Sequence, residues 1–220
     1  RDKLVTGVQT CALPISQKGG CGKSTMAQMI SREFAAADWD VKIADFDVRQ
    51  GTTTYWKQLR EQNKQSPVIA VEPVGTVQQA MKSDPVCDLL LFDGPAKASK
   101  LVEEIAKASD LIVLPTSVGE ADLRPAVLLA HELKKMNIPV SKIIFALNRA
   151  GTDAENDQAR AYIQEAGYEI AEGELPERSG YRQAYQQGRA PTEAQFKTLR
   201  EKAAIVARSI AKKIEALGKE

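Results

Sequence analysis

A glycine-rich segment at residues 18–25 holds the densest group of residues able to do chemistry. It reads Lys-Gly-Gly-Cys-Gly-Lys-Ser-Thr, and an amphipathic stretch that predicts a helix over Ser24–Ala37 follows at once. Glycines allow successive backbone N–H groups to turn inward at a helix N-terminus, which creates a cradle for phosphate oxygens. Lys23 would bring an ammonium group to the terminal phosphates, and Ser24 a hydroxyl to Mg²⁺. The segment therefore predicts a nucleoside triphosphate site.

Two features distinguish this loop from the simplest phosphate-binding motif. Gln17 stands where that motif has glycine, and a second lysine, Lys18, lies five residues before Lys23. Cys21 occupies the variable position, where the backbone does the binding, so we interpret it as a small tolerated residue. The residues that we expect to contact the nucleotide are Gly19, Gly20, Cys21, Gly22, Lys23, Ser24 and Thr25.

Acidic residues end two of the apolar runs further along the chain. Leu89–Phe92 runs into Asp93 and then Gly-Pro, the form expected of an aspartate that holds Mg²⁺ through water. Val41–Phe46 contains Asp45 and is followed by Asp47. Open α/β sheets place their working groups at the carboxyl ends of strands, so we expect these acids to lie near the phosphate loop.

The elements that must position these residues follow an alternating pattern. Short apolar runs alternate with longer amphipathic ones, which predicts βαβ units and an α/β fold: a doubly wound, mostly parallel sheet with helices on both faces. The predicted strands are Val41–Phe46, Val68–Val71, Asp88–Phe92, Leu111–Leu114 and Ile143–Leu147, with a weaker one at Tyr168–Ala171. The predicted helices after the first are Thr76–Lys82, Ser99–Ala108, Leu123–Met136, Asp153–Glu165 and Thr192–Leu217, with Ser99 and Thr192 as N-caps.

The opening of the chain departs from this pattern. Residues 1–16 resemble a translated sequencing adapter fused to a truncated reading frame, and Pro14 stands where a central strand needs a backbone donor. We expect a single domain over residues 17–220, led by this atypical segment and beginning with a flawed strand.

The phosphate loop with its extra lysine resembles the deviant Walker A ATPases, the group that includes the ParA and MinD proteins. The resemblance runs from Gln17 to Pro191 and implies a P-loop ATPase that binds ATP with Mg²⁺. It implies that Lys18 reaches the nucleotide of a partner subunit, that Asp47 positions the attacking water, and that Asp93 and Ser24 serve the metal.

The same resemblance gives roles to three further residues. Asp45 would support either Mg²⁺ or the loop, Asn148 would contact adenine, and Pro176 would pack beside the base. An alternative for Asn148 is that it opens a turn before Gly151. The family segment Asp-x-Asp-Pro-Gln-Gly has Val-Arg in place of its proline here, which leaves the role of Gln50 open. No Asn-Lys-x-Asp segment, which guanine recognition would want, occurs.

The composition limits the further roles of the chain. The net charge is +1, so attraction to nucleic acid or membrane has to be local, and residues 178–220 hold ten Lys and Arg against four Glu. Three cysteines at unrelated spacings suggest neither a disulfide framework nor a zinc site. No apolar run approaches the roughly 20 residues of a membrane span, which favours a cytoplasmic protein.

The resemblance leaves the biological role open between three interpretations. The first is a ParA-type ATPase for plasmid or chromosome partition, which forms a homodimer on ATP, binds nonspecific DNA through the basic C-terminal region and answers to a ParB-like activating partner. That region is alternatively only a solvated helix face. The second is a MinD-like membrane-associated positioning protein, which we favour less because the last helix lacks bulky aromatic residues. The third is a metabolic enzyme on the same fold.

Overall fold

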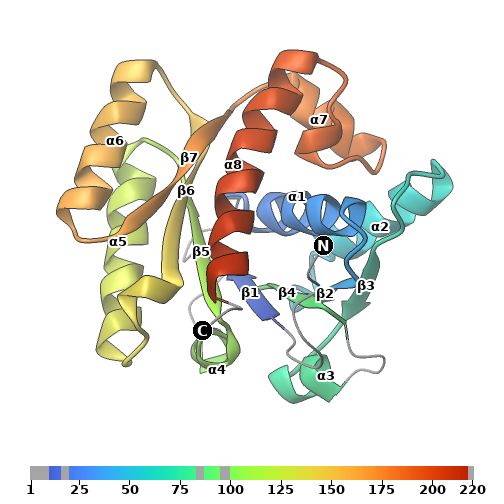
Figure 1. Cartoon of the computed structure of the whole chain (residues 1–220), viewed down its shortest axis with the longest axis horizontal. Helices are drawn as coiled ribbons and strands as arrows, with labels where there is room; N and C mark the ends of the chain where they lie inside the picture. Colours follow the sequence, from blue (N-terminus) through green and yellow to red (C-terminus); the bar gives the residue numbers. More distant parts are fainter. Residues whose placement is uncertain (1–9, 16–19, 83–86, 95–99, 218–220) are drawn as a thin grey trace.

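Seven parallel strands form one sheet at the centre of the molecule (Figure 1). The computed structural model describes residues 10–15, 20–82, 87–94 and 100–217. Their order across the sheet is β3-β2-β4-β1-β5-β6-β7, and every pairing among the described residues is parallel. The bounds are β1 (Thr10–Pro14), β2 (Val41–Asp45), β3 (Ala70–Pro73), β4 (Leu89–Asp93), β5 (Leu111–Thr116), β6 (Ile143–Ala150) and β7 (Glu169–Pro176).

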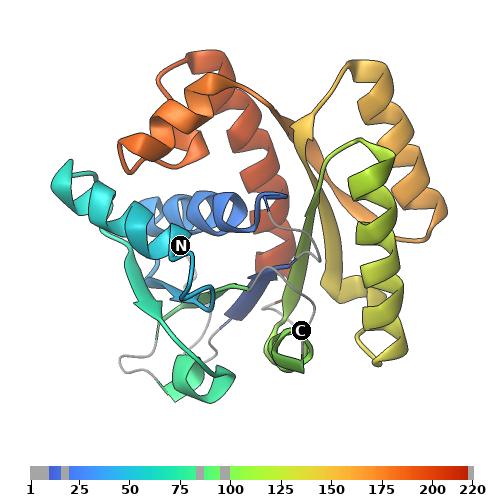
Figure 2. The same cartoon turned by 180° about the vertical axis from the view of Figure 1, so that it is seen from behind.

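Helices cover both faces of the sheet, as the two opposite views in Figures 1 and 2 show. One apolar cluster joins the sheet to α3, α4, α5 and α6, and a second joins it to α1, α2 and α8. The bounds are α1 (Lys23–Ala36), α2 (Thr52–Gln62), α3 (Val77–Lys82), α4 (Lys100–Ala108), α5 (Glu120–Lys135), α6 (Asp153–Glu165), α7 (Ser179–Gln186) and α8 (Lys197–Leu217), with 3₁₀ turns η1 (Val140–Lys142) and η2 (Pro191–Glu193). The predicted doubly wound α/β fold is confirmed.

Apolar runs build the middle of the sheet because both of its faces are covered. All five residues of β4 and all six of β5 are buried. Between them lies β1, and Pro14 is its last residue, beside Val113 of β5. The next N–H group, that of Ile15, donates to the carbonyl of Val113 at 3.0 Å. The strand is therefore formed despite the proline, because the missing donor falls at its end.

Several predicted elements differ from the structure. Helices α2 and α7 were not predicted at all. The predicted strand at Val68–Val71 lies two residues later, since Val68 is 82% exposed and β3 begins at Ala70. Thr192 does not cap the last helix, because it lies in η2 while α8 begins at Lys197. Ser99 lies outside the described residues. Helix α6 has the predicted bounds.

A buried ion pair fastens the C-terminal end of α2. Arg60 is 2% exposed, and its guanidinium donates to both carboxylate oxygens of Glu193 at 2.7 and 3.1 Å. It also donates to the carbonyl oxygens of Gly188 and Pro67, and lies 5.4 Å from the ring centroid of Trp56. Each nitrogen of this guanidinium donates at least one hydrogen bond, so the cluster holds α2 to the segment that precedes α8.

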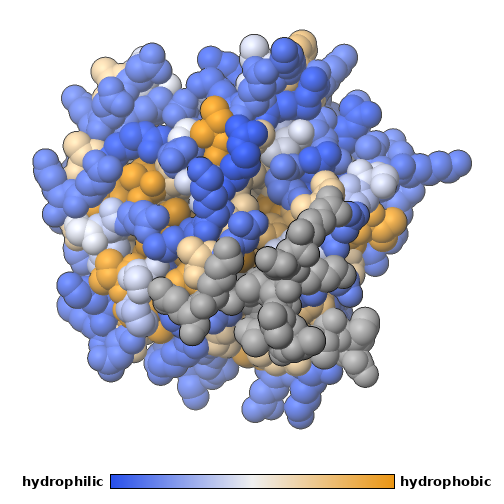
Figure 3. All heavy atoms as spheres, in the orientation of Figure 1, coloured by the Kyte–Doolittle hydropathy of each residue, from blue (hydrophilic) through white to orange (hydrophobic). Residues whose placement is uncertain are grey.

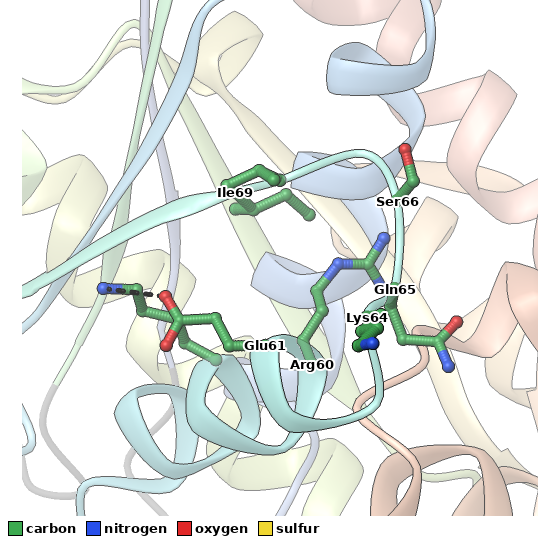
Figure 4. A pocket seen from close by; sticks show the side chains of 8 residues that line it. Arg60, Glu61, Lys64, Gln65, Ser66 and Ile69 are labelled. Atoms are coloured by element: carbon green, nitrogen blue, oxygen red, sulfur yellow. Dashed lines mark ion pairs between the residues drawn. The ribbon is translucent and has the colours of Figure 1, made fainter.

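A cavity of about 370 Å³ opens beside this ion pair (Figure 4). Its walls come from the last turns of α2 and the loop before β3, and an ion pair of 3.5 Å between Lys57 and Glu61 lines it. The carboxyl ends of the strands lie at the other end of α2, so this cavity is separate from the predicted nucleotide site.

None of the helices in the described part of the chain has the length and hydropathy needed to cross a membrane.

Candidate functional site

The phosphate loop meets α1 in the geometry that an anion site requires. Gly20 and Gly22 have φ values of 79° and 109°, a region that favours glycine, and α1 begins at Lys23 without a side-chain cap. Its first N–H groups are therefore available to a ligand. A Cβ atom on Gly22 would lie 2.1 Å from Nδ2 of Asn148, so this position has no room for a side chain. Lys18 and Gly19, both predicted site residues, lie outside the described residues.

Two aspartates lie side by side at the carboxyl ends of neighbouring strands. Asp45 ends β2 and Asp93 ends β4, and the two are direct partners in the strand register. Both side chains are buried, with exposures of 0% and 1%. Two carboxylates this close repel each other when both are ionised, and burial strengthens that repulsion. A cation bound beside them would relieve this repulsion.

Consecutive threonines at the start of α2 bind these two carboxylates. The hydroxyl of Thr53 donates to Oδ2 of Asp93 at 2.6 Å. The backbone N–H and the hydroxyl of Thr54 both donate to Oδ2 of Asp45, at 3.0 and 2.7 Å. The N–H of Asp47 donates to the other oxygen of Asp45 at 3.1 Å. Both oxygens of Asp45 thus accept hydrogen bonds from the loop and from the start of α2, while its predicted support of Mg²⁺ stays a prediction.

The carboxyl group of Asp93 is less completely satisfied. Its Oδ1 atom is buried and has no hydrogen-bond partner among the described residues. Burial raises the pKa of Asp93 from 3.8 to about 6, and the charge of Asp45 acts in the same direction. The hydroxyls of Thr53 and Ser24 and the ammonium of Lys23 lower the pKa. An unsatisfied buried oxygen is costly in a folded protein, which marks Oδ1 as a ligand position.

The groups around Asp93 suit Mg²⁺ better than a metal held by protein side chains alone. Within the described ranges, no three His, Cys, Asp or Glu side chains converge. Mg²⁺ in nucleotide sites uses one or two carboxylates together with phosphate oxygens and water, and a hydroxyl from the phosphate loop. Oδ1 of Asp93 and the hydroxyl of Ser24 supply that set, so the residues present fit the ion.

The loop between β2 and α2 is closed by Asp47. Its carbonyl oxygen accepts hydrogen bonds from the N–H groups of Gln50 and Gly51 at 3.1 and 2.7 Å, and its Oδ1 accepts from Gln50 at 3.3 Å. Val48 and Arg49, which replace the family's proline, lie exposed in this turn. Gln50 contributes its backbone to the turn, while its side chain is exposed. Asp47 is half-buried on the same edge of the sheet as Asp93.

Asn148 supports the phosphate loop from β6. It is 9% exposed, and its Nδ2 donates to the carbonyl oxygen of Cys21 at 2.7 Å. Arg149 follows with φ of 55°, and one of its guanidinium nitrogens would lie 3.7 Å from a Cβ on Gly20. Pro176 ends β7 beside Ala150, on the same edge. Asn148 thus contacts the loop backbone, and adenine recognition by Asn148 and Pro176 stays a prediction.

Sequence reasoning missed the residues that α2 and its neighbours bring to the site. Besides Thr53 and Thr54, the hydroxyl of Tyr185 donates to the carbonyl of Thr52 at 3.0 Å, and the charges of Asp45 and Asp93 contribute to its raised pKa after burial and Tyr55. The signal was a run of three threonines directly after Gly51, at the end of the acidic segment. Hydroxyl groups there are well placed to bind buried carboxylates.

Comparisons with known proteins agree with this geometry. Protein ParA of Rhizobium radiobacter is 25% identical over 183 residues, which cover 79% of this chain and 81% of that protein. Among solved structures, apo McdA of Cyanothece superposes with a TM-score of 0.72 at 16% identity, covering 92% of this chain and 100% of that one. MinD of Aquifex aeolicus gives 0.68 at 17% identity, covering 96% and 97%. These structures share the fold.

The chain also matches a known protein family over most of its length. Residues 13–192 match the family described as the CobQ/CobB/MinD/ParA nucleotide binding domain, a span that includes every site residue described above. The chain therefore belongs to this family and is a P-loop ATPase of the ParA/MinD type.

Proposed function

We propose that this chain binds ATP with Mg²⁺, hydrolyses it to ADP and phosphate, and switches between monomer and dimer as it does so. The observation that carries the proposal is the buried Oδ1 of Asp93, which has no hydrogen-bond partner among the described residues and lies beside Ser24 and Lys23 at the start of α1. That arrangement supplies a carboxylate and a hydroxyl to one ion, and an ammonium group with free N–H groups to the phosphates.

Each residue has a distinct role in this proposal. Lys23 neutralises the terminal phosphates, and bound magnesium would screen the charge that develops on them. Asp47 orients the attacking water from its place beyond β2. Lys18 is assigned to the nucleotide of a partner subunit on the resemblance to deviant Walker A ATPases. Closure of two subunits would then complete both sites at once, which makes the dimer the active form.

For the biological role, we favour ATP-dependent DNA binding in plasmid or chromosome partition, in the cytoplasm or on the nucleoid, with a ParB-like activating partner. The curated relative named ParA supports this choice. The basic C-terminal region supports it only in part, because some of its lysines form ion pairs with glutamates of β7. Lys202 and Lys213 pair with Glu174 and Glu169 at 2.7 and 2.6 Å.

The remaining basic residues of α8 are Lys197, Arg200, Arg208 and Lys212, and Lys197 pairs with Glu201 at 3.7 Å. Arg200 donates to the carbonyl oxygens of Ala194 and Gln195. Arg208 and Lys212 are exposed and form no ion pair within the described residues. We therefore propose Arg208 and Lys212 as the phosphate contacts on this helix.

The MinD-like alternative requires an apolar face on the last helix. Of the large apolar residues of α8, Ile205 is exposed, at 38%. Figure 3 shows that the visible part of the face carrying α8 is mostly hydrophilic, with separate apolar patches between hydrophilic side chains. An interfacial helix needs a continuous apolar stripe, so membrane association is the weaker proposal. A metabolic reaction on this fold remains a third candidate, which product analysis with ATP would reveal.

Phosphate release and light scattering test the proposed ATPase. We expect ATP-dependent dimerisation and turnover in the wild type. Both Lys18→Ala and Lys23→Ala should lose turnover, and Lys23→Ala should lose nucleotide as well. Wild-type turnover in both variants would show that the assigned lysines do not act.

Gel-shift assays test the DNA proposal. With ATP, the wild type should retain DNA at low salt and release it steeply as salt rises. Arg208→Glu combined with Lys212→Glu should abolish the shift. The matched control is Lys134→Glu with Lys135→Glu on α5, an equal change of charge at exposed residues of another helix. Equal loss in both double variants, or no ATP-dependent shift in the wild type, would contradict this contact surface.

A further inference from the structure

The hydroxyl of Thr53 joins three elements around the proposed metal position. Thr53 is fully buried in the first turn of α2. Its hydroxyl donates to Oδ2 of Asp93 in β4 at 2.6 Å and accepts from Nε2 of Gln28 in α1 at 3.4 Å. The phosphate-loop helix, the acidic strand end and α2 therefore meet at one oxygen atom.

This network fixes which way the carboxyl group of Asp93 faces. An amide nitrogen donates and cannot accept, so the bond from Gln28 leaves the single proton of Thr53 directed at Asp93. Threonine is stiff at χ1, which limits other arrangements in the first turn of a helix. Oδ2 is thereby held by Thr53, and Oδ1 is left buried with no hydrogen-bond partner in the part of the chain that the structure describes. The two oxygens of one carboxylate thus have different environments.

Thr54 provides an internal contrast. Its hydroxyl donates to Oδ2 of Asp45, whose other oxygen accepts from the N–H of Asp47. Both oxygens of Asp45 therefore accept hydrogen bonds, and the contact of Thr54 with Asp45 stabilises the fold. Thr53 makes a similar hydrogen bond to Asp93, but the other oxygen of that carboxylate accepts no hydrogen bond in the described residues.

We propose that Thr53 is a positioning residue: it orients Asp93 so that Oδ1 faces the magnesium ion, and it couples that ion to the loop that carries Asp47. The inference rests on the proposed Mg²⁺-ATP function. Metal ligands in proteins depend on outer hydrogen-bond partners for their orientation, and loss of such a partner typically weakens metal affinity about 10- to 100-fold. Because Thr53 lies in the first turn of α2, which directly follows residues 46–51, a change at Asp93 reaches that loop through a single helical turn.

A magnesium titration of bound nucleotide tests the positioning role. The variants are Thr53→Val, which removes the hydroxyl at nearly constant shape, and Thr53→Ser, which restores it. Thr52→Val is the matched control, since Thr52 is half-buried in the same turn and its hydroxyl makes no hydrogen bond in the described part of the chain. A fluorescent ATP analogue is bound first in EDTA and then titrated with Mg²⁺.

We expect Thr53→Val to raise the half-saturating Mg²⁺ concentration at least about 10-fold. Its affinity for the analogue in EDTA should stay within about 2-fold of wild type, because the phosphate loop is unchanged. Thr53→Ser and Thr52→Val should titrate like the wild type. Equal magnesium dependence in Thr53→Val and wild type, or an equal defect in Thr53→Val and Thr53→Ser, would overturn the inference.

Trypsin digestion at Arg49 provides a second measurement, which also reports whether each Thr53 variant is folded. Arg49 is exposed in the loop between β2 and α2. Mg²⁺ with ATP should protect this bond in the wild type and in Thr53→Ser, and fail to do so in Thr53→Ala, a second variant that replaces Thr53→Val if that one does not fold. Protection retained in Thr53→Ala would overturn the coupling. Absence of nucleotide binding in the wild type would instead remove the proposed function, and this inference with it.

Discussion

The two ends of α2 are both anchored by buried charges, but only one end is electrostatically complete. At the C-terminal end, Arg60 faces Glu193 and two carbonyl oxygens, so opposite charges are paired and each guanidinium nitrogen donates a hydrogen bond. At the N-terminal end, Asp45 and Asp93 are like charges in direct register, and one oxygen of Asp93 has no partner in the described residues.

The difference separates a structural cluster from a ligand site. A buried group that lacks a partner raises the free energy of the folded protein, whereas a matched pair does not invite a further ligand. Proteins keep such unsatisfied groups where a substrate or ion completes them. The same helix therefore has one end fixed by the fold and one end at the site that we propose for Mg²⁺ and ATP.

The largest expected effect comes from breaking the complete end. Arg60→Ala removes four hydrogen bonds and leaves the largely buried carboxylate of Glu193 with Arg32, at 3.3 Å, as its remaining cation, so we expect the free energy of unfolding to fall by about 3 kcal/mol. Urea unfolding in EDTA measures this. The matched control is Lys107→Ala, which removes an exposed ion pair with Glu103 and should cost less than about 1 kcal/mol. Similar losses in the two variants would contradict the assigned structural role.

The second effect is a pH dependence of stability at the incomplete end. Burial raises the pKa of Asp93 from 3.8 to about 6, so the folded protein binds this proton more tightly than the unfolded chain. This tighter proton binding stabilises the folded protein fully below pH 3.8, and the stabilisation is lost as the pH rises through about 6. The free energy of unfolding falls by about 3 kcal/mol at most over this range.

Asp93→Asn isolates that contribution. The difference in unfolding free energy between wild type and Asp93→Asn, measured in EDTA from pH 4 to 7, should change steadily in favour of the variant as the pH rises. Other carboxyl groups titrate in both proteins and cancel in the difference. A pH-independent difference would mean that Asp93 is not held in a carboxylate-repelling site.

The smallest effect concerns the support of the phosphate loop by Asn148. Asn148→Ala removes one hydrogen bond to Cys21, so we expect a loss of about 1 kcal/mol of stability. ATP and GTP affinities measured on the same variant separate its two predicted roles. If Asn148 reads adenine, preference for ATP over GTP falls, and if it only supports the loop, both affinities fall together.

The sequence was sufficient for most of the sheet because apolar runs reveal buried parallel strands directly. It also predicted that Asp45 and Asp93 would lie at the carboxyl ends of strands, where the structure pairs them in direct register. Helix α2 was missed because Thr52–Thr54 are β-branched residues of low helix propensity. Its stability comes from Trp56 and from a partner of Arg60 that is 133 residues away.

The missed helix explains the missed part of the site. Without α2, nothing in the sequence places the hydroxyl of Thr53 on Asp93, since the two residues are 40 positions apart. The predicted phosphate-loop residues needed only local glycine geometry, which Gly20 and Gly22 provide. Local motifs were therefore predictable, and contacts that depend on tertiary packing were not.

The most direct test of the nucleotide site is calorimetric titration of ATP in the presence of Mg²⁺. The wild type should bind one ATP per chain, and Lys23→Ala should weaken binding roughly 10- to 100-fold, as expected when a charged hydrogen bond is lost. Lys107→Ala, far from the phosphate loop in the sequence and exposed, should bind like the wild type. Equal affinity in all three proteins, or no saturable binding by the wild type, would contradict the account.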